Sequence, residues 1–289
     1  MKSGKSWQHI APDASVAWSD MCNKNVYKKI AAYLWSGVFL MGCTVGIAQA
    51  VQVEGIGFLM SRVVMMAEKR GGATITLNNN TDNVYLMQNR VQQADVKLGA
   101  PVSNADAEKV EKMPFMVLPP LSRVEERGTL PLHIILGADN TLPEDRESLF
   151  FLTAKAIPAV PSKPDNGKPA SNGSESSQRI ILALENSIKL FYRPKGLKDD
   201  AIASVAGLLT VSRHDNQLRL TNPTPYYATL SSLKVNGKPV AEEALNAMIP
   251  PKGWQDYPLP PGVTRGDVSW QLIDEYGLTT DAQSKPLHD

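Results

Sequence analysis

Apolar and polar residues alternate in short runs along most of the chain after residue 50. A period of two residues is that of a β-strand with one buried face. Between residues 51 and 194 the pattern predicts seven strands, which lie within residues 53–66, 73–77, 84–92, 115–118, 130–136, 149–157 and 180–192. Short strands at this spacing favour a sandwich of two antiparallel sheets.

The rest of the chain repeats this alternation more weakly. Its candidate strands lie within residues 208–213, 217–221, 228–235, 247–249, 257–259 and 268–273. Turn residues such as Asn236-Gly237 separate them, and residues 242–247 could form one helical turn. The string Arg-Pro-Lys-Gly at 193–196 breaks the preceding strand. We therefore expect two domains, a sandwich over residues 51–194 and a smaller one over residues 195–289.

One loop is expected to be long. Residues 158–178 are rich in Pro, Lys, Asn, Gly and Ser and carry almost no apolar side chains. Such a composition buries too little surface to offset the entropy lost on ordering. This segment is predicted to be a mobile loop.

The strand after that loop has two different faces. Ile180, Leu182 and Leu184 fall on one side of a continuous ribbon, and Lys189 falls on the other. The apolar row has two interpretations, because it could face the core of its own sandwich or complete the sheet of a partner. If this row and Lys189 serve one cleft, a bulge or twist is needed between them.

Composition and charge restrict the function. The 289 residues carry a net charge of +1, with acidic and basic residues interspersed, and this gives no footprint for nucleic acid. Four histidines are scattered along the chain, and no metal-ligand spacing, nucleophile elbow or phosphate loop is present. We therefore expect no catalysis, no metal and no cofactor.

The N-terminal residues are typical of a secretory signal. Three lysines precede an apolar stretch at residues 30–43, and Ala48-Gln49-Ala50 follows. The apolar stretch is shorter than the roughly 20 residues of a spanning helix, so we expect cleavage after Ala50 and no stable membrane span. Met21 is an alternative start, and lipidation of Cys43 stays open. Because both cysteines precede residue 50, the mature domains should lack a disulfide.

Three unusual strings occur in a fixed order. They are Asp-Arg-Glu-Ser-Leu-Phe-Phe at 145–151, Ile-Lys-Leu-Phe-Tyr-Arg-Pro at 188–194 and Asn-Pro-Thr-Pro-Tyr-Tyr at 222–227. Together they resemble the periplasmic chaperones of pilus assembly, over almost all of residues 51–277. The resemblance implies an all-β chain with two immunoglobulin-like β-sandwich domains in an L-shaped arrangement. It also implies a periplasmic chaperone that completes the sheet of pilus (fimbrial) subunits by donor-strand complementation and delivers them to an outer-membrane usher.

The same resemblance assigns residues to a site. Arg62 and Lys189 match the pair of cations that binds the terminal carboxylate of the subunit. The donor strand would insert Ile180, Leu182 and Leu184 into the subunit. An ion network between the domains would consist of Glu147, Arg193 and Glu275.

Some positions depart from the family pattern. Val84 replaces a common proline, and Arg90 replaces a nearby tryptophan; neither position is expected to touch the cleft. The long loop is typical of the branch that builds thin fibres, but the disulfide of that branch is missing, so the branch stays open. The main alternative is a structural or adhesive sandwich protein, such as a fimbrial subunit, whose apolar row is satisfied internally. The context of Lys189 and the second domain favour the chaperone.

Overall fold

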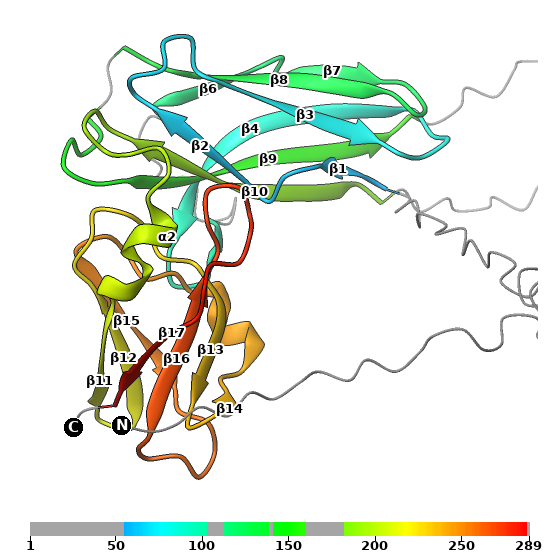
Figure 1. Ribbon diagram of the computed structural model, residues 1–289. Coiled ribbons are helices and arrows are strands. Elements are labelled where there is room, and N and C mark those ends of the chain that lie inside the picture. Colours follow the sequence, from blue (N-terminus) through cyan, green and yellow to red (C-terminus); the bar gives the residue numbers. More distant parts are fainter. Residues whose placement is uncertain (1–54, 103–112, 139–140, 160–181, 288–289) are drawn as a thin grey trace, which may run out of the picture. The chain divides into compact units, whose positions relative to one another are not determined.

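The computed structural model describes residues 55–102, 113–138, 141–159 and 182–287 (Figure 1). Three predictions therefore fall outside the described residues: the signal segment 1–50, the role of Ile180, and all of the predicted loop beyond Ala159. Within the described ranges, no helix is both long and apolar enough to span a membrane.

Two sheets form the first sandwich. One has the strand order β1-β3-β8-β6, and the other has the order β2-β10-β9-β4-β5, with β7 paired to β4. The strands are β1 (Ile56–Phe58), β2 (Arg62–Met66), β3 (Ala73–Asn79), β4 (Tyr85–Asp95), β5 (Ala100–Pro101), β6 (Phe115–Leu118), β7 (Leu121–Val124), β8 (Thr129–Leu136), β9 (Ser148–Pro158) and β10 (Leu184–Arg193).

The core of this sandwich lies where the alternation predicts it. On β4, Tyr85, Met87 and Val91 point inward and are buried, and the intervening Leu86 is exposed. Leu132 and Ile134 of β8 meet them from the opposite sheet within one cluster. The period-two pattern therefore reports which face of each strand is covered.

The predicted first strand is divided in the structure. β1 pairs antiparallel with β3, whereas β2 pairs in parallel with β10 in the other sheet. Residues 59–61 make the crossing between the two sheets. Alternation cannot show this division, because both pieces present apolar residues to the same core.

The second sandwich is smaller. Its sheets have the orders β11-β12-β15 and β14-β13-β16-β17. The strands are β11 (Thr210–His214), β12 (Gln217–Asn222), β13 (Leu230–Val235), β14 (Lys238–Pro239), β15 (Gly253–Pro258), β16 (Asp267–Leu272) and β17 (Gln283–Pro286). Its core includes the fully buried Trp270 and Tyr257. The all-β prediction with two sandwiches is thereby confirmed.

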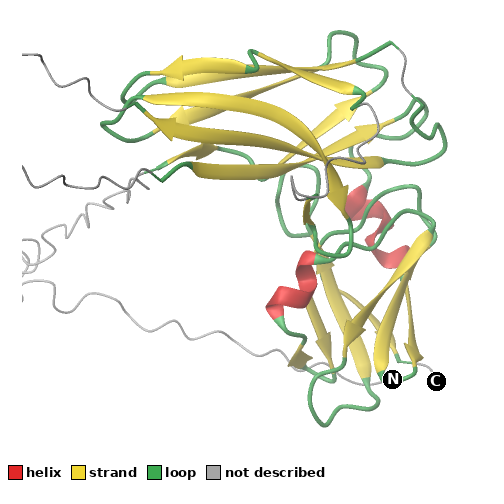
Figure 2. Cartoon of the chain, turned by 180° about the vertical axis from the view of Figure 1, so that it is seen from behind, coloured by secondary structure: helices red, strands yellow, loops and turns green. Residues whose placement is uncertain are grey.

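Short helices occur only in the second half of the described chain (Figure 2). The turn η3 (Glu242–Asn246) is a 3-10 helix at the place where the sequence predicts one turn. The helix α2 (Ile202–Val205), followed by η2 (Ala206–Leu208), was not predicted. The strand predicted at 247–249 is wrong, because this segment makes only an isolated bridge, between Ile249 and Ala228.

β10 is paired on both sides over only part of its length. It pairs antiparallel with β9 from Leu184 to Tyr192 without a register shift. β2 accompanies it only from Lys189 to Arg193. Among the strands that the structure describes, none pairs with the other edge of residues 184–188. The sheet therefore has an open edge that ends at Lys189, and we call residues 184–188 the open edge.

Candidate functional site

Two cations lie side by side at the end of the open edge. Arg62 begins β2, and the parallel register places it directly opposite Lys189 of β10. The Arg62 side chain is held in place: the residue is only 5% exposed, and its Nη1 donates to the carbonyl oxygen of Ile273 at 2.9 Å. The guanidinium carbon lies 5.6 Å from the ring centroid of Phe191. The Nε atom of Arg62 is buried, and no atom of the described residues accepts a hydrogen bond from it.

Electrostatics at this pair favour an anion. Burial lowers the pKa of Arg62 to about 10, although the charges of Asp274, Glu275 and Glu147 act in the opposite direction. Burial, followed by the charge of Arg62, lowers the pKa of Lys189 to about 8. Within the described part of the chain neither cation forms an ion pair. A bound carboxylate would relieve both the repulsion and the unsatisfied Nε.

The apolar donor residues that the structure describes are exposed. Leu182 is 72% exposed and lies just before β10, and Leu184 is 57% exposed. Leu184 shares its face with Ile188 and Leu190, which are buried in the core of the first sandwich. The same face is therefore covered at one end of β10 and uncovered at the other.

The sequence called for a bulge or a twist if the apolar row and Lys189 serve one cleft, and β10 has no bulge between Leu184 and Lys189. The register of β10 runs unbroken from Leu184 onward, so Leu184 and Lys189 face opposite sides of the sheet. Lys189 lies on the same face of β10 as Phe191. Phe191 is buried with Leu149 and Met248 in a small cluster that is separate from the cores of the two sandwiches. Leu184 belongs to the open edge, and the cation pair lies where this edge ends. A ligand strand paired with the open edge would therefore be close to both, although Leu184 and Lys189 lie on opposite faces.

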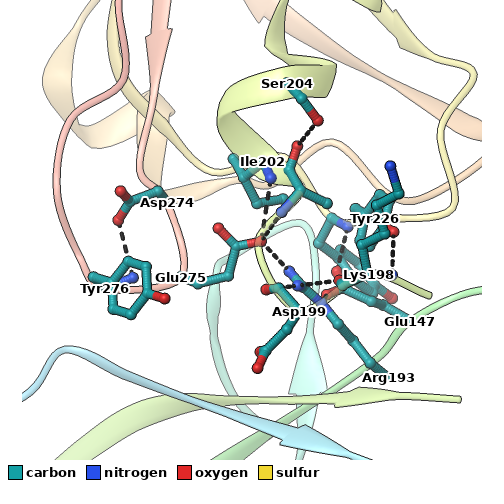
Figure 3. Close-up of polar contacts among 12 residues, drawn as sticks. Glu147, Arg193, Lys198, Asp199, Ile202, Ser204, Tyr226, Asp274, Glu275 and Tyr276 are labelled. Atoms are coloured by element: carbon teal, nitrogen blue, oxygen red, sulfur yellow. Dashed lines mark hydrogen bonds and ion pairs between the residues drawn. The ribbon is translucent and has the colours of Figure 1, made fainter.

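The three residues of the predicted ion network meet in the structure (Figure 3). Arg193 Nε donates to Glu147 Oε1 at 2.5 Å, and Arg193 Nη2 donates to Glu275 Oε1 at 2.7 Å. All three side chains are buried. Burial raises the pKa of Glu147, although the charge of Arg193 opposes this rise. Burial acts to lower the pKa of Arg193, but the charges and hydrogen bonds of Glu147 and Glu275 together outweigh it, so the pKa rises.

The network also holds the segment that follows β10. Arg193 Nη1 donates to the carbonyl oxygens of Lys198, at 2.8 Å, and Asp199. Glu275 Oε1 accepts the backbone N–H groups of Ala201 and Ile202, at 2.9 and 3.1 Å, where α2 begins. Figure 3 shows these bonds converging on the two carboxylates and the guanidinium. No motif in the sequence indicated these backbone partners.

Arg90 lies closer to the site than its sequence position suggested. Its Nη2 donates to both carboxylate oxygens of Glu185, at 3.0 and 2.9 Å. Glu185 belongs to the open edge, and Arg90 lies on β4, opposite Thr153 of β9. The pair therefore spans the outer face of three neighbouring strands. The replacement of the family's tryptophan by an arginine was the signal that could have identified this contact.

Comparison with known proteins decides the family. Residues 55–198 match the family "Pili and flagellar-assembly chaperone, PapD N-terminal domain", and residues 204–284 match "Pili assembly chaperone PapD, C-terminal domain". The chaperone protein FocC of Escherichia coli is 32% identical over 227 residues, which cover 78% of this chain and 88% of FocC. This chain belongs to the PapD family of pilus-assembly chaperones. Proteins of this family are not known as enzymes.

Two solved structures resemble this chaperone. The E. coli chaperone DraB has a TM-score of 0.64 and 32% identity, over 81% of this chain and 97% of DraB. A chain from the complex of the Salmonella enterica SafA pilin with the SafB chaperone has a TM-score of 0.63 and 27% identity, over 82% of this chain and 99% of that chain. The domain boundary after residue 194 and the roles of the site residues stay predictions.

Proposed function

We propose that this chaperone binds a pilus subunit by lending β10 to the subunit's incomplete sheet, and that Arg62 and Lys189 bind the C-terminal carboxylate of the subunit. The observation that carries the proposal is that the open edge of β10 ends at the two cations. The SafA–SafB complex, a pilin bound to a chaperone, supports a subunit as the ligand. Delivery to an outer-membrane usher follows from membership of the family.

The open edge determines how the ligand lies. An unpaired strand edge offers N–H and C=O groups to an incoming strand. From Lys189 onward β2 occupies that position, so the incoming strand must stop there. If its carboxylate end meets Lys189 and Arg62, the rest of the strand lies along residues 184–188. The incoming strand then runs in the same direction as β10.

Side chains of the donor strand supply apolar contact. Leu182 and Leu184 are exposed in the free chaperone. Full burial of such a side chain contributes about 1.5–3 kcal/mol, before the cost of association is subtracted. We assign the same role to Ile180, which lies outside the described residues. The ion network of Glu147, Arg193 and Glu275 serves this site by holding Ile273, whose carbonyl binds Arg62, beside β2.

Export to the periplasm would bring this chaperone together with the fimbrial subunits that it binds. Its homologues are periplasmic fimbrial chaperones. We propose that residues 1–50 are a signal peptide that is cleaved after Ala50. N-terminal sequencing of the protein recovered from the periplasm would test the cleavage site.

Co-expression with the cognate fimbrial subunit tests the binding site. The wild type should give a 1:1 complex, and Arg62→Ala and Lys189→Ala should each reduce the yield of complex strongly. Lys234→Ala is a matched control, because Lys234 is an exposed lysine on β13 of the second sandwich. If both substitutions leave the yield and affinity at the wild-type level, the cation pair is not the carboxylate site.

A further inference from the structure

The outer face of one sheet in the second sandwich carries an unusual set of side chains. In this sheet β12 pairs antiparallel with β11 on one side and with β15 on the other (Figure 1). Leu218, Leu220 and Tyr257 of these strands point into the core. The alternating residues form the outer face. The register aligns them in three rows, which are Thr210–Thr221–Trp254, Ser212–Arg219–Asp256 and His214–Gln217–Pro258.

Trp254 is the aromatic residue of this face, and it is 52% exposed. The guanidinium carbon of Arg219 lies 3.7 Å from the centroid of its ring, so the guanidinium covers one face of the indole. Arg219 is fixed in turn by Asp256, because its Nε and Nη2 atoms donate to the two carboxylate oxygens at 2.8 Å each. The indole therefore lies on a fixed support and offers its other face to solvent.

The composition of this face restricts the class of ligand. The charge of Arg219 is compensated by Asp256, and His214 Nδ1 lies 3.5 Å from Asp215 Oδ2 at the end of β11. No lysine, leucine, isoleucine, valine or methionine occurs among the aligned residues. A polyanion or a membrane surface would require a basic cluster, and the centre of a protein–protein interface would require several apolar side chains. The face instead combines one aromatic ring with hydroxyl, amide and paired charged groups, which suits a neutral, hydroxyl-rich ligand.

We infer that this face binds a neutral, β-linked oligosaccharide, with one sugar ring stacked on Trp254. A sugar ring with equatorial substituents has flat faces made of C–H groups, and these faces pack on an aromatic ring. Its hydroxyl groups require donors and acceptors, which the hydroxyls of Thr221 and Ser212 and the Arg219–Asp256 pair provide next to the indole. Sheet faces of other β folds bind oligosaccharides as well. The open edge of β10 belongs to the other sandwich, so this inference is independent of the proposed function.

The row that contains Trp254 sets the direction of the ligand. Neighbouring strands lie about 4.8 Å apart, a distance close to the length of one sugar unit. With the first ring on Trp254 of β15, the next two rings lie over Thr221 of β12 and Thr210 of β11. A β-1,4-linked chain of glucose units is a flat ribbon that can follow this row, whereas an α-1,4-linked chain curves away from it. The face should therefore select the linkage.

Two glucose tetrasaccharides that differ only in linkage test this inference on the intact chaperone. In calorimetric titrations, β-1,4-linked cellotetraose should bind about tenfold more tightly than α-1,4-linked maltotetraose. Trp254→Ala should weaken the binding of cellotetraose by about tenfold or more, and Trp254→Phe, which keeps a ring, should recover part of the loss. Cellotetraose should also protect the indole of Trp254 from quenching by acrylamide. Trp270, the other tryptophan of the described residues, cannot give this signal, because it is only 1% exposed.

A second exposed aromatic residue provides the control. Tyr276 is 66% exposed and follows β16 of the other sheet, so Tyr276→Ala should bind cellotetraose like the wild type. Trp254→Ala should still form the complex with a fimbrial subunit. If cellotetraose does not bind saturably, binds no better than maltotetraose or binds equally well to Trp254→Ala, the inference is wrong and the proposed function stands. If Trp254→Ala lowers the yield of the subunit complex or changes only self-association, the face is a protein contact, and this would also overturn the inference.

Discussion

Arg62 and Lys189 are direct partners across the parallel ladder of β2 and β10, and within the described residues neither forms an ion pair. Two neighbouring cations that are partly removed from water destabilise the free protein unless an anion compensates them. A site of this kind lowers the free energy of unfolding of the free protein, and the same charges favour binding of an anion. The predictions on Lys189 follow from this relationship.

The substitution Lys189→Met should stabilise the free chaperone and abolish subunit binding. The methionine retains much of the side-chain length and removes the charge whose burial lowers the pKa. We expect the free energy of unfolding to rise by about 1 kcal/mol, a value that allows for the partial exposure of Lys189. Urea denaturation measures the change, with Lys234→Met as the control. A clear loss of stability would contradict the account.

The stability of the free chaperone should depend on pH through Lys189. Its pKa is about 8 in the folded chain, against an ordinary value of 10.5. Below about pH 8 the side chain is charged in both states, so the full cost of burying the charge is present. Between about pH 8 and 10.5 the unfolded chain binds more protons than the folded chain, so the free energy of unfolding rises with pH. Denaturation curves over this range should show the rise in the wild type and lack it in Lys189→Met.

Binding should respond to pH in the opposite direction. A carboxylate is attracted by the charged form of Lys189, and this form is lost as the pH rises above about 8 in the free chaperone. The affinity for a peptide that copies the C-terminal strand of the subunit and keeps its free carboxylate should therefore fall in alkaline solution, whereas the affinity for the same peptide with a C-terminal amide should change little. Titrations at several pH values check this, and equal profiles for acid and amide would exclude Lys189 as a carboxylate ligand.

Removing the cation of the ion network should destabilise the chaperone severely. In Arg193→Met the buried carboxylates of Glu147 and Glu275 lose their partner. Breaking a buried pair in this way costs about 3–5 kcal/mol. The triple variant Glu147→Gln/Arg193→Met/Glu275→Gln should recover part of this loss, because no uncompensated charge remains. Chemical denaturation compares the two, and a loss below about 1 kcal/mol in Arg193→Met would be inconsistent with the buried network.

The pair Arg90–Glu185 should position the open edge for binding. Because both side chains are partly exposed, Arg90→Ala should lower the free energy of unfolding by only about 0.5–1 kcal/mol. The association rate with a subunit should fall more than this small change suggests, because the open edge loses its link to β4. The exchanged pair Arg90→Glu/Glu185→Arg should restore the rate. If Arg90→Ala leaves association unchanged, the pair is only a surface contact.

Much of the fold could be predicted because alternation depends on burial. Strands such as β4 and β8 put every second residue into the core, and their positions were predicted closely. β17 was missed because its four residues, Gln283–Pro286, carry no apolar alternation. The division of the first strand at residues 59–61 was missed for another reason, since the pattern records burial and not the sheet to which a strand belongs.

Less of the site than of the fold could be predicted from the sequence. The motifs pointed to Arg62 and Lys189, but only the register shows that they are ladder partners. Leu184 and Lys189 lie on opposite faces of the strand, so a bulge or a twist was expected if both side chains serve one cleft. The structure shows an unbroken strand whose free edge connects them. Neither the open edge nor the row that Trp254 forms with Thr221 and Thr210 could be seen without the fold.

Hydrogen–deuterium exchange along β10 tests the central claim most directly. In the free chaperone, the amides of residues 184–188 that do not donate to β9 should exchange quickly, because no described strand pairs with that edge. In the complex with a fimbrial subunit the same amides should become strongly protected, and this protection should disappear when Arg62→Ala prevents the complex. A stable complex in which these amides exchange as fast as in the free protein would show that β10 is not the lent strand.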